Sequence, residues 1–307
     1  MFIKNQIFAA PLAGITDKPF RRVIRMFSPD VSLVTEMISC HSLVQGHKNC
    51  PRNFDRYDDE GNIGAQIFGA EPDVMAEAAK ILADQGAKWI DINMGCPVPK
   101  VATRSGAGAY LMRDHVLAGK IMHSVVKAVS VPVSIKTRLG WDSTHCDWRD
   151  LIDVAFNNGI KFATLHGRTR AQGYTGSAVL PDVTDCRIPV IANGDIKTLA
   201  DADRAEKLGF SGVMVGRGML GKPWFLNEIV GENAKPDNVG AVVLQHLQYV
   251  IDYYGNAVGV PMFRKHVAWY CVGMPNSADF RMQINTITDV NELKSAICEF
   301  WGCVCDI

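Results

Sequence analysis

Short apolar runs with the composition of β-strands alternate, as far as Gly216, with longer segments in which apolar residues recur at helical spacing. This alternation is typical of a parallel sheet whose strands are joined by covering helices. Because eight parallel strands close a barrel, we expect an α/β fold of the (β/α)8 TIM-barrel type, with an open eight-stranded sheet as the alternative. The predicted strands are residues 7–14, 33–39, 63–69, 88–94, 131–138, 162–166, 188–193 and 212–216.

The segments between these strands predict helices, several of which end at a glycine suited to a left-handed C-cap. Residues 40–60, after the second strand, are polar and contain proline, so we expect part of this connection to be loop. The predicted helices are residues 72–86, 115–129, 147–159 and 199–209.

The pattern changes after the eighth strand. A short helix is predicted near residues 223–229, and the polar stretch 233–238 indicates a linker. We therefore expect a barrel domain over residues 1–235 and a small helical domain over residues 236–307. Breaks at Gly255, Gly259, Gly273 and Pro275 would divide this second domain into helices over 239–254, 261–272, 278–285 and 290–300.

Composition limits the classes of function. The 307 residues are 48% hydrophobic, and 32 Lys and Arg balance 32 Asp and Glu, so composition gives no basic signature of nucleic-acid binding. The nine cysteines are scattered, and the chain shows neither a signal peptide nor an apolar run of membrane-spanning length. We expect a cytoplasmic protein without membrane contact, without a metal, since the C-terminal cysteines lack zinc-site spacing, and without an obligate protein partner.

The carboxyl ends of barrel strands form the active site, and here the fourth strand is followed by Asn93-Met94-Gly95-Cys96-Pro97. Gly95 and Pro97 fix a loop that would hold Cys96 over the barrel mouth. Since no helix or strand buries Cys96, we expect a chemical role for it, with a small packed hydrophobe as the alternative.

Other strand ends carry further polar side chains. Lys136 in a strand pattern is costly unless it faces a partner, so we expect Lys136, and His166 on the next strand, to point into the mouth. Gln66 fits a structural hydrogen bond as well as a ligand contact. The first strand ends in Pro11-Leu12-Ala13-Gly14, whose small residues would let a flat ligand lie against backbone, although this segment alone fits an ordinary turn better.

Strands seven and eight end in Asn193-Gly194-Asp195 and Gly216-Arg217. In barrels, backbone N–H groups of these loops commonly hold a phosphate, so we expect a phosphorylated cofactor. The glycine-rich segment Ser105–Ala109 lacks the preceding strand of a dinucleotide-binding motif, and we interpret it as a flexible flap over the site.

Taken together, these motifs resemble those of the tRNA-dihydrouridine synthases, and Arg264–Tyr270 resembles the bacterial B-type branch of that family. The resemblance extends from about residue 7 to about residue 300. It implies FMN-dependent reduction of the C5–C6 double bond of a uridine in the tRNA D-loop, with NADPH as the reductant of the flavin. The matching motifs are Pro11–Gly14, Gln66–Gly69, Asn93–Pro97, Lys136–Arg138, His166–Thr169, Asn193–Asp195 and Gly216-Arg217.

The resemblance also implies roles for individual residues. Cys96 would donate a proton to C5 after hydride reaches C6, as a thiol protonated at neutral pH can do. Pro11, Leu12, Ala13, Gln66, Lys136 and His166 would bind the flavin ring, and Asn193, Gly194, Asp195, Gly216 and Arg217 its phosphate. Asn93 and Arg168 would contact uracil, and Arg264 and Lys265 the tRNA.

Three other functions are compatible with parts of the sequence. A flavin reductase of free pyrimidines or other small activated alkenes would use the same barrel without the helical tail. A Schiff-base aldolase would use Lys136 as its nucleophile and would be colourless. A tRNA-binding protein without chemistry would keep its function when Cys96 is replaced.

Overall fold

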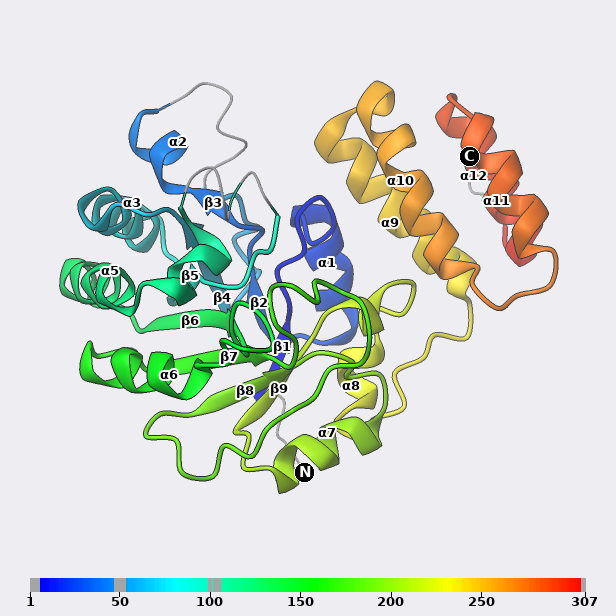
Figure 1. Cartoon of the computed structure of the whole chain (residues 1–307). Coiled ribbons are helices and arrows are strands. Elements are labelled where there is room, and N and C mark those ends of the chain that lie inside the picture. Colours follow the sequence, from blue (N-terminus) through cyan, green and yellow to red (C-terminus); the bar gives the residue numbers. More distant parts are fainter. Residues whose placement is uncertain (1–5, 47–53, 99–100, 102–105, 305–307) are drawn as a thin grey trace. The chain divides into compact units, whose positions relative to one another are not determined.

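The structure is a computed structural model of the chain and describes residues 6–46, 54–98, 101 and 106–304. Strands and helices alternate over most of the chain as far as β9, and the described elements after β9 are helical (Figure 1). The contacts divide the chain into a barrel unit, Met1–Thr16 with Asp30–Gly216, and a helical unit, Asp17–Pro29 with Arg217–Ile307. The division after residue 235 that the sequence predicts stays a prediction.

The barrel unit is a closed parallel sheet. Strand β1 (Ile7–Ala9) pairs with both β2 (Ser32–Val34) and β9 (Gly212–Val215), and β2 also pairs with β4 (Ile63–Phe68), which closes the circle. The predicted TIM barrel is thus confirmed over the open sheet. The predicted second strand is split, because β3 (Ile38–Ser39) pairs separately with the end of β4. The wall is completed by β5 (Ile90–Asn93), β6 (Val133–Arg138), β7 (Phe162–His166) and β8 (Val190–Asn193).

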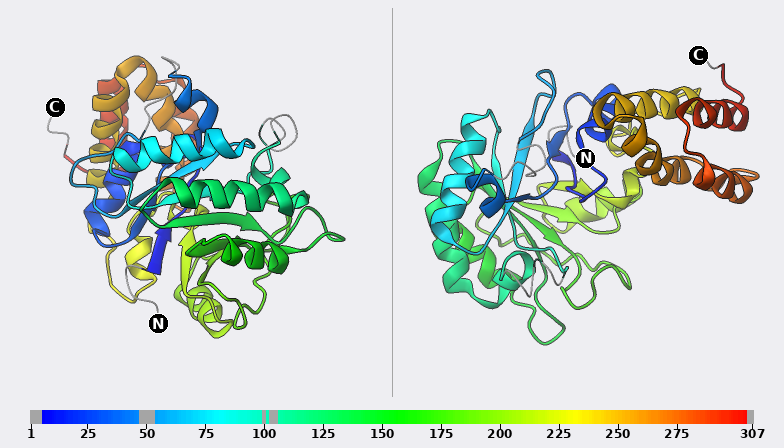
Figure 2. Two further views of the ribbon diagram at one scale, coloured as in Figure 1. Left: turned by 90° about the vertical axis from the view of Figure 1, so that its left-hand side faces the viewer. Right: turned by 90° about the horizontal axis from the view of Figure 1, so that it is seen from above.

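Helices follow the strands and form an outer layer on the barrel unit (Figures 1 and 2). They end near their predicted limits, because Gly86, Gly159 and Gly209 adopt positive φ angles of 97°, 86° and 86° just beyond three of them. The connection 167–189, all of which the structure describes, contains no helix. The helices are α2 (Cys40–Val44), α3 (Pro72–Asp84), α5 (His115–Ala128), α6 (Trp148–Asn157) and α7 (Leu199–Lys207), with the 3₁₀ helix η2 (Gly108–Arg113).

Aromatic side chains fill the amino-terminal end of the barrel interior. The ring centroids of Phe8 and Trp89 lie 6.2 Å apart, and those of Phe8 and Phe162 lie 5.7 Å apart. Gly64 makes room for this cluster, since a Cβ atom at that position would lie 2.1 Å from Cε2 of Trp89. The polar site at the opposite end of the barrel therefore rests on a rigid apolar floor.

Replacing Gly64 with alanine should lower the free energy of unfolding by about 1–3 kcal/mol, because the added methyl overlaps the buried Trp89 ring. Urea denaturation followed by circular dichroism measures the change. Gly216→Ala is the matched control, since a Cβ there would meet Ala10 and Leu12 at ordinary distances of 3.8 and 3.9 Å. Equal stability of the Gly64→Ala variant and the wild-type protein would show that the floor is not packed as described.

The helical unit contains one helix that the sequence analysis does not name, α1 (Lys18–Phe27), and one whose start it places wrongly. The predicted break at Gly259 is wrong, because α10 (Asn256–Tyr270) runs through both Gly259 and Pro261. A Cβ at Gly259 would lie 2.9 Å from Ile251, so glycine allows close packing of two helices here. The other elements are η3 (Arg217–Met219), α8 (Phe225–Glu228), α9 (Val239–Tyr254), α11 (Ser277–Thr286) and α12 (Val290–Trp301).

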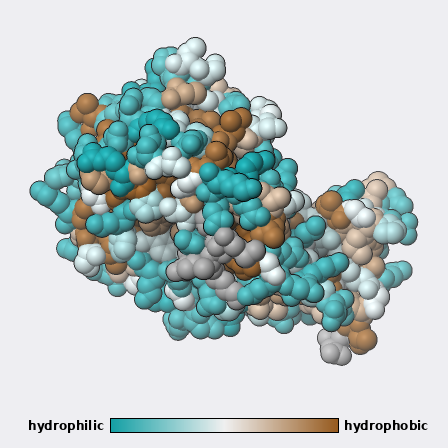
Figure 3. Space-filling model, turned by 90° about the horizontal axis from the view of Figure 1, so that it is seen from below, coloured by the Kyte–Doolittle hydropathy of each residue, from teal (hydrophilic) through white to brown (hydrophobic). Residues whose placement is uncertain are grey.

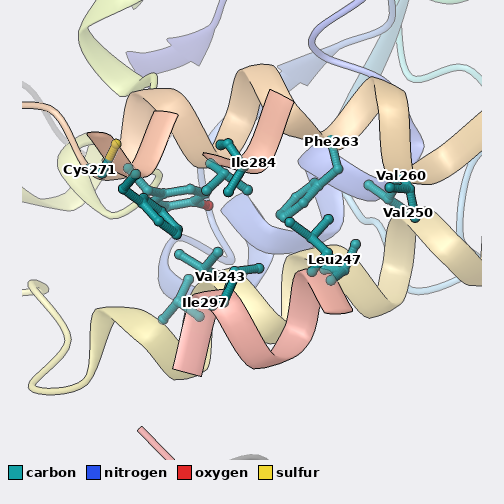
Figure 4. Close-up of a cluster of buried hydrophobic side chains, with 14 of the residues drawn as sticks. Val243, Leu247, Val250, Val260, Phe263, Cys271, Ile284 and Ile297 are labelled. Atoms are coloured by element: carbon teal, nitrogen blue, oxygen red, sulfur yellow. The ribbon is translucent and has the colours of Figure 1, made fainter. Parts of the chain in front are cut away.

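Apolar side chains from α9, α10, α11 and α12 form the core of the helical unit, with Leu247 and Phe263 near its centre (Figure 4). Two histidines, His246 and His266, lie in this core with ring centroids 4.6 Å apart. Burial lowers the pKa of His246 to about 3 and that of His266 well below its ordinary value. Nδ1 of His246 lies 3.2 Å from the Tyr270 hydroxyl. Both imidazoles are therefore neutral at physiological pH.

The buried histidines predict acid sensitivity. Because the folded protein holds them neutral, the unfolded chain alone takes up their protons as pH falls below about 6.5, so stability is lost with acidification. Each should cost about 1.4 kcal/mol per pH unit below that point. Urea unfolding between pH 7.5 and pH 5 should give a shallower pH slope for His246→Phe than for the wild-type chain. Identical slopes would contradict the burial of a neutral His246.

Hydrophilic residues cover much of the face seen in Figure 3, where apolar residues form scattered groups. Within the described ranges, no helix combines the length and apolar character needed to cross a bilayer.

Cys298 in α12 is disulfide-bonded, which the sequence analysis does not anticipate. The cysteines with free thiols in the part of the chain that the structure describes are Cys40, Cys96, Cys146, Cys186, Cys271 and Cys303.

Candidate active site

Polar side chains from five neighbouring strands gather inside the carboxyl end of the barrel. The register pairs Asn93 with Lys136 and His166 with Asn193. Nζ of Lys136 on β6 donates to Oδ1 of Asn193 on β8 at 2.9 Å, past the intervening strand, so both side chains face the interior. Together with Gln66 on β4, these residues are brought together as the sequence predicts.

A chain of hydrogen bonds orders the interior below the mouth. Nδ2 of Asn93 donates to Oε1 of Gln66 at 2.8 Å, and Nε2 of Gln66 donates to Asp91 at 2.7 Å. The Ser134 hydroxyl donates to the other Asp91 oxygen at 2.6 Å. Burial raises the pKa of Asp91, although these two bonds and the Lys136 charge oppose the rise. Asp91 and Ser134, for which the sequence motifs indicate no role, fix the orientation of Gln66 and Asn93.

This network positions the Cys96 turn. Oδ1 of Asn93 accepts hydrogen bonds from the backbone N–H groups of Gly95 at 3.2 Å and Cys96 at 3.0 Å. On the other side of the turn, Ala109 donates its N–H to the Cys96 carbonyl at 3.1 Å. Ala109 is fully buried, so this end of the predicted flap is packed against the turn. The Cys96 thiol is free and partly exposed.

Arg138 joins the Cys96 turn to the long loop after β7. Its Nε donates to the Gly95 carbonyl at 2.7 Å, and its Nη1 donates to the carbonyls of Thr169 at 3.1 Å and Gly173 at 2.8 Å. Arg138 is 2% exposed, and burial lowers the pKa of its guanidinium. Sequence reasoning missed this role, although Arg138 lies two positions after Lys136 and so on the same face of β6.

Lys136 places a cation inside the mouth, beside Asn193. Burial, and then the nearby Arg138 charge, lower its pKa to about 8, while Asp91 and Cys96 oppose the shift. Its partner Asn193 is itself fixed, because Nδ2 of Asn193 donates to the Met214 carbonyl at 2.8 Å. The position of the ammonium group is therefore fixed, and the group loses its charge at a lower pH than an exposed lysine does.

Arg168 is enclosed rather than presented to the mouth, since it is 2% exposed. It donates to Asp195 and to the Gly176 carbonyl, both at 2.6 Å, and to the Thr175 carbonyl at 3.2 Å. Its Nη1 lies 3.3 Å from Nε2 of His166. This geometry favours holding the loop and the imidazole over a contact with substrate.

Asp195 likewise has an internal partner. Burial alone would raise the pKa of Asp195, but the Ala178 N–H at 2.8 Å and the Arg168 guanidinium hold this pKa below its ordinary value. Its φ of 53° follows a φ of 112° at Gly194, where a Cβ would lie 2.7 Å from Ala178. The Asp195 side chain is thus held by groups of the chain itself.

The first strand closes the other side of the mouth. Pro11 and Leu12 are partly exposed and Ala13 is exposed. The Leu12 N–H donates to the Thr16 hydroxyl at 2.8 Å, which fixes the turn. Because a Cβ at Gly216 would lie 3.9 Å from Leu12, these two loops are neighbours.

Tyr174 is a site residue that the sequence analysis missed. Its side chain is 55% exposed, its ring centroid lies 6.4 Å from that of His166, and the Arg138 guanidinium lies 5.6 Å from its centre. Gly173 and Gly176, with φ of 56° and 63°, flank it in the loop. An exposed aromatic ring beside the mouth offers a face for a flat ligand.

Residues 8–301 match the family model described as dihydrouridine synthase (Dus). The chain belongs to the dihydrouridine synthase family. A probable tRNA-dihydrouridine synthase of Rickettsia bellii is 42% identical, with 98% of this chain and 96% of that protein aligned. tRNA-dihydrouridine synthase B of Xanthomonas axonopodis pv. citri is 39% identical, with 92% of this chain and 89% of that protein aligned.

The resemblance that the motifs indicate, including that to the B-type branch, is therefore confirmed. A tRNA-dihydrouridine synthase B of Pseudomonas putida is 38% identical over 94% of this chain and 88% of its own length. The solved structure of a variant of NCR from Zymomonas mobilis aligns with a TM-score of 0.54 at 16% identity, over 78% of this chain and 91% of the other. That likeness is one of fold, and it agrees with the barrel.

Three residues that the resemblance assigns to ligand binding belong to the helical unit of this family member. Arg217 is exposed and follows Gly216 directly. Arg264 in α10 donates from Nη2 to the Ile287 carbonyl, so part of its donor capacity holds the helices together. Lys265, the next residue, is half-buried. Their roles toward cofactor and tRNA stay predictions.

Proposed function

We propose that this member of the family reduces the C5–C6 double bond of a uridine in the tRNA D-loop, with FMN as the cofactor and NADPH as its reductant. The observation that carries the proposal is the placement of Cys96. Asn93 from below and Arg138 from the side hold its turn over a mouth lined by Lys136, His166 and Asn193. A thiol held above a polar mouth suits the delivery of one proton to a bound substrate.

The chemistry of the donor set fits FMN. Gln66 offers an amide, Lys136 an ammonium and His166 an imidazole within one mouth, as the polar edge of an isoalloxazine requires. Pro11, Leu12 and Ala13 would present backbone and small apolar groups to the ring. The backbone of Gly194, Asp195 and Gly216 would approach the phosphate, and the Arg217 side chain would complete its binding.

When bound, FMN would supply a hydride to C6 of the uracil. The residues of this chain provide the remainder of the reaction. Lys136 would place positive charge where the reduced cofactor gathers negative charge, and His166, held through Arg168, would bind the same edge. Cys96 would transfer its proton to C5, with the thiolate regaining a proton from solvent.

Uracil recognition would fall to Asn93 and Tyr174. Asn93 is oriented by Gln66 and the Cys96 turn and would contact the base through Nδ2, since its Oδ1 already accepts two hydrogen bonds. The exposed Tyr174 ring would cover the base. For Arg168 we propose a positioning role in place of the predicted uracil contact, because its donors hold Asp195 and the loop.

The uridine would have to leave its stack in the tRNA to enter the mouth, at a cost of a few kcal/mol. The helical unit, with Arg264 and Lys265, would contribute phosphate contacts that help to repay it. Relatives named tRNA-dihydrouridine synthase B support the tRNA substrate. We expect the reaction to take place in the cytoplasm.

Two measurements test the proposal. The purified protein should show flavin absorbance that NADPH bleaches and that unmodified tRNA restores, with dihydrouridine found by mass spectrometry of the D-loop. A colourless protein to which added FMN does not bind would reject the cofactor. Restoration of the flavin bands by free uracil but not by tRNA would favour a reductase of small alkenes instead.

A further inference from the structure

A second cavity of about 370 Å³ lies in the barrel unit and shares no lining residue with the site described above. It opens beside the loop that follows β6. Its lining combines aromatic, cationic and acidic groups rather than the apolar side chains of a packing defect. The lining residues are Met112, Arg113, Trp141, Asp142, His145 and Asp147.

Two arginines stack on the aromatic ring of this cavity. The guanidinium carbons of Arg170 and Arg113 lie 4.4 and 5.0 Å from the centre of the Trp141 ring. Nε of Arg170 is buried and has no hydrogen-bond partner among the described residues, although burial of such a donor is costly. Within the described part of the chain, no carboxylate lies within ion-pair distance of either guanidinium.

A second arginine–tryptophan pair, Arg149 with Trp148, differs from this cluster because its arginine has a carboxylate partner. Arg149 stacks at 4.5 Å on Trp148, but its Nη1 lies 2.5 Å from Asp185 and its Nη2 donates to the Asp182 carbonyl at 2.8 Å. The charge of that arginine is compensated within the chain. Neither Arg113, which lines the cavity, nor Arg170 has such a carboxylate partner among the described residues.

The carboxylates of the cavity are partly engaged already. Asp142 accepts hydrogen bonds from the hydroxyl of Thr144 at 2.7 Å and from His145, and these hold the pKa of Asp142 well below its ordinary value. Asp147 lies 3.2 Å from Nε2 of His115. A simple anion would meet negative as well as positive groups here. A nucleotide suits both, because its phosphate pairs with guanidinium groups while the N–H groups of its base donate to carboxylates.

The cavity and the barrel mouth are built on the same loops. The N–H groups of Arg170 and Ala171, in the loop after β7, donate to the carbonyls of Gly140 and Trp141 in the loop after β6, both at 2.9 Å. Arg138 connects the same loop after β7 to the Cys96 turn. Tyr110, whose ring meets Trp141 edge-on at 6.1 Å, directly follows the residue that bonds the Cys96 carbonyl. A ligand here would lie beside a substrate in the mouth.

We propose that this cavity is a nucleotide subsite, in which the guanidinium groups of Arg113 and Arg170 take a phosphate and the flat cluster that they form with Trp141 stacks a base. The inference rests on the proposed function, because that reaction brings two sources of a nucleotide to the protein besides FMN and the reduced uridine. One is a tRNA nucleotide next to the reduced uridine, and the other is the adenosine phosphate portion of NADPH.

The test compares Arg170→Gln, Arg113→Gln and Trp141→Leu with Arg149→Gln, which removes the same charge from a compensated arginine–tryptophan pair. Binding of an unmodified tRNA transcript is measured as a function of salt, and the KM for NADPH is measured from flavin reduction without tRNA. For a tRNA source, Trp141→Leu should raise the Kd for tRNA by about 5–100-fold. Each arginine variant should then reduce the slope of log Kd against log salt by about 0.7–0.9.

A rise of at least fivefold in the KM for NADPH, with the Kd for tRNA unchanged, would assign the same subsite to the dinucleotide. Trp141→Phe keeps an aromatic ring and should retain most of the binding, which separates stacking from a folding defect. The subsite is excluded if all three variants stay within twofold of the Arg149→Gln protein in both measurements while the wild-type enzyme is active. Wild-type protein that neither binds tRNA nor oxidises NADPH would reject the subsite together with the proposed function.

Discussion

Replacing Cys96 with alanine should slow the formation of dihydrouridine by about 10²–10⁴-fold, the usual contribution of a positioned acid. The loss should fall on one half of the reaction. NADPH should still reduce the flavin at the wild-type rate, because Lys136, His166 and Asn193 remain in place. Stopped-flow absorbance separates the two steps, since the variant should bleach normally with NADPH and recover its colour slowly with tRNA.

Cys186→Ala is the matched control for this experiment. Cys186 also carries a free, partly exposed thiol in the barrel unit, and it lies apart from the residues of the mouth. Its replacement should leave both half-reactions unchanged. Reoxidation of the Cys96→Ala enzyme by tRNA within threefold of the wild-type rate would remove Cys96 from the role of acid and leave its turn a structural feature.

The barrel could be predicted because its sequence signal is local. Each strand is a short apolar run, and glycines such as Gly86 and Gly159 end the helices at the expected places. The second domain shows where local reasoning fails. Glycine and proline ordinarily interrupt helices, but Gly259 lies in a helix because a side chain there would collide with Ile251. Such a requirement comes from a packed neighbour, which the local pattern does not contain.

The same limit applies to the site. The strand ends identify Lys136, His166 and Cys96, because the period of a strand and the direction of a parallel barrel decide where those side chains lie. They do not reveal that Arg168 forms an ion pair with Asp195, or that Arg138 donates hydrogen bonds to two separate loops. Both arginines occur in motifs that look suited to ligand binding. The two arginines stabilise loops rather than bind a ligand because backbone carbonyl groups from other segments accept their hydrogen bonds, and the local sequence does not show where those carbonyl groups lie.

Lys136 gives the second large effect, because it combines a central position with an unusually labile charge. Burial lowers its pKa to about 8, so the ammonium that would attract FMN is lost as pH rises through that value. In the cofactor-free protein, the Kd for FMN should therefore be flat below pH 7 and rise by up to about tenfold per pH unit above pH 8. Fluorescence quenching of added FMN between pH 6.5 and 9.5 measures the curve.

Lys136→Met should remove this dependence and weaken FMN binding at pH 7 by about 10–100-fold, the value of a charge-assisted hydrogen bond and its field in a buried site. Lys120→Met, at an exposed position of α5, is the control and should reproduce the wild-type curve. Parallel pH curves for wild-type and Lys136→Met proteins would mean that another group controls the affinity. Bound FMN should raise the pKa of Lys136 above its value in the cofactor-free protein, because the anion stabilises the ammonium form. The charge of Lys136 is thus expected to differ most between the free and the FMN-loaded enzyme between pH 8 and pH 9.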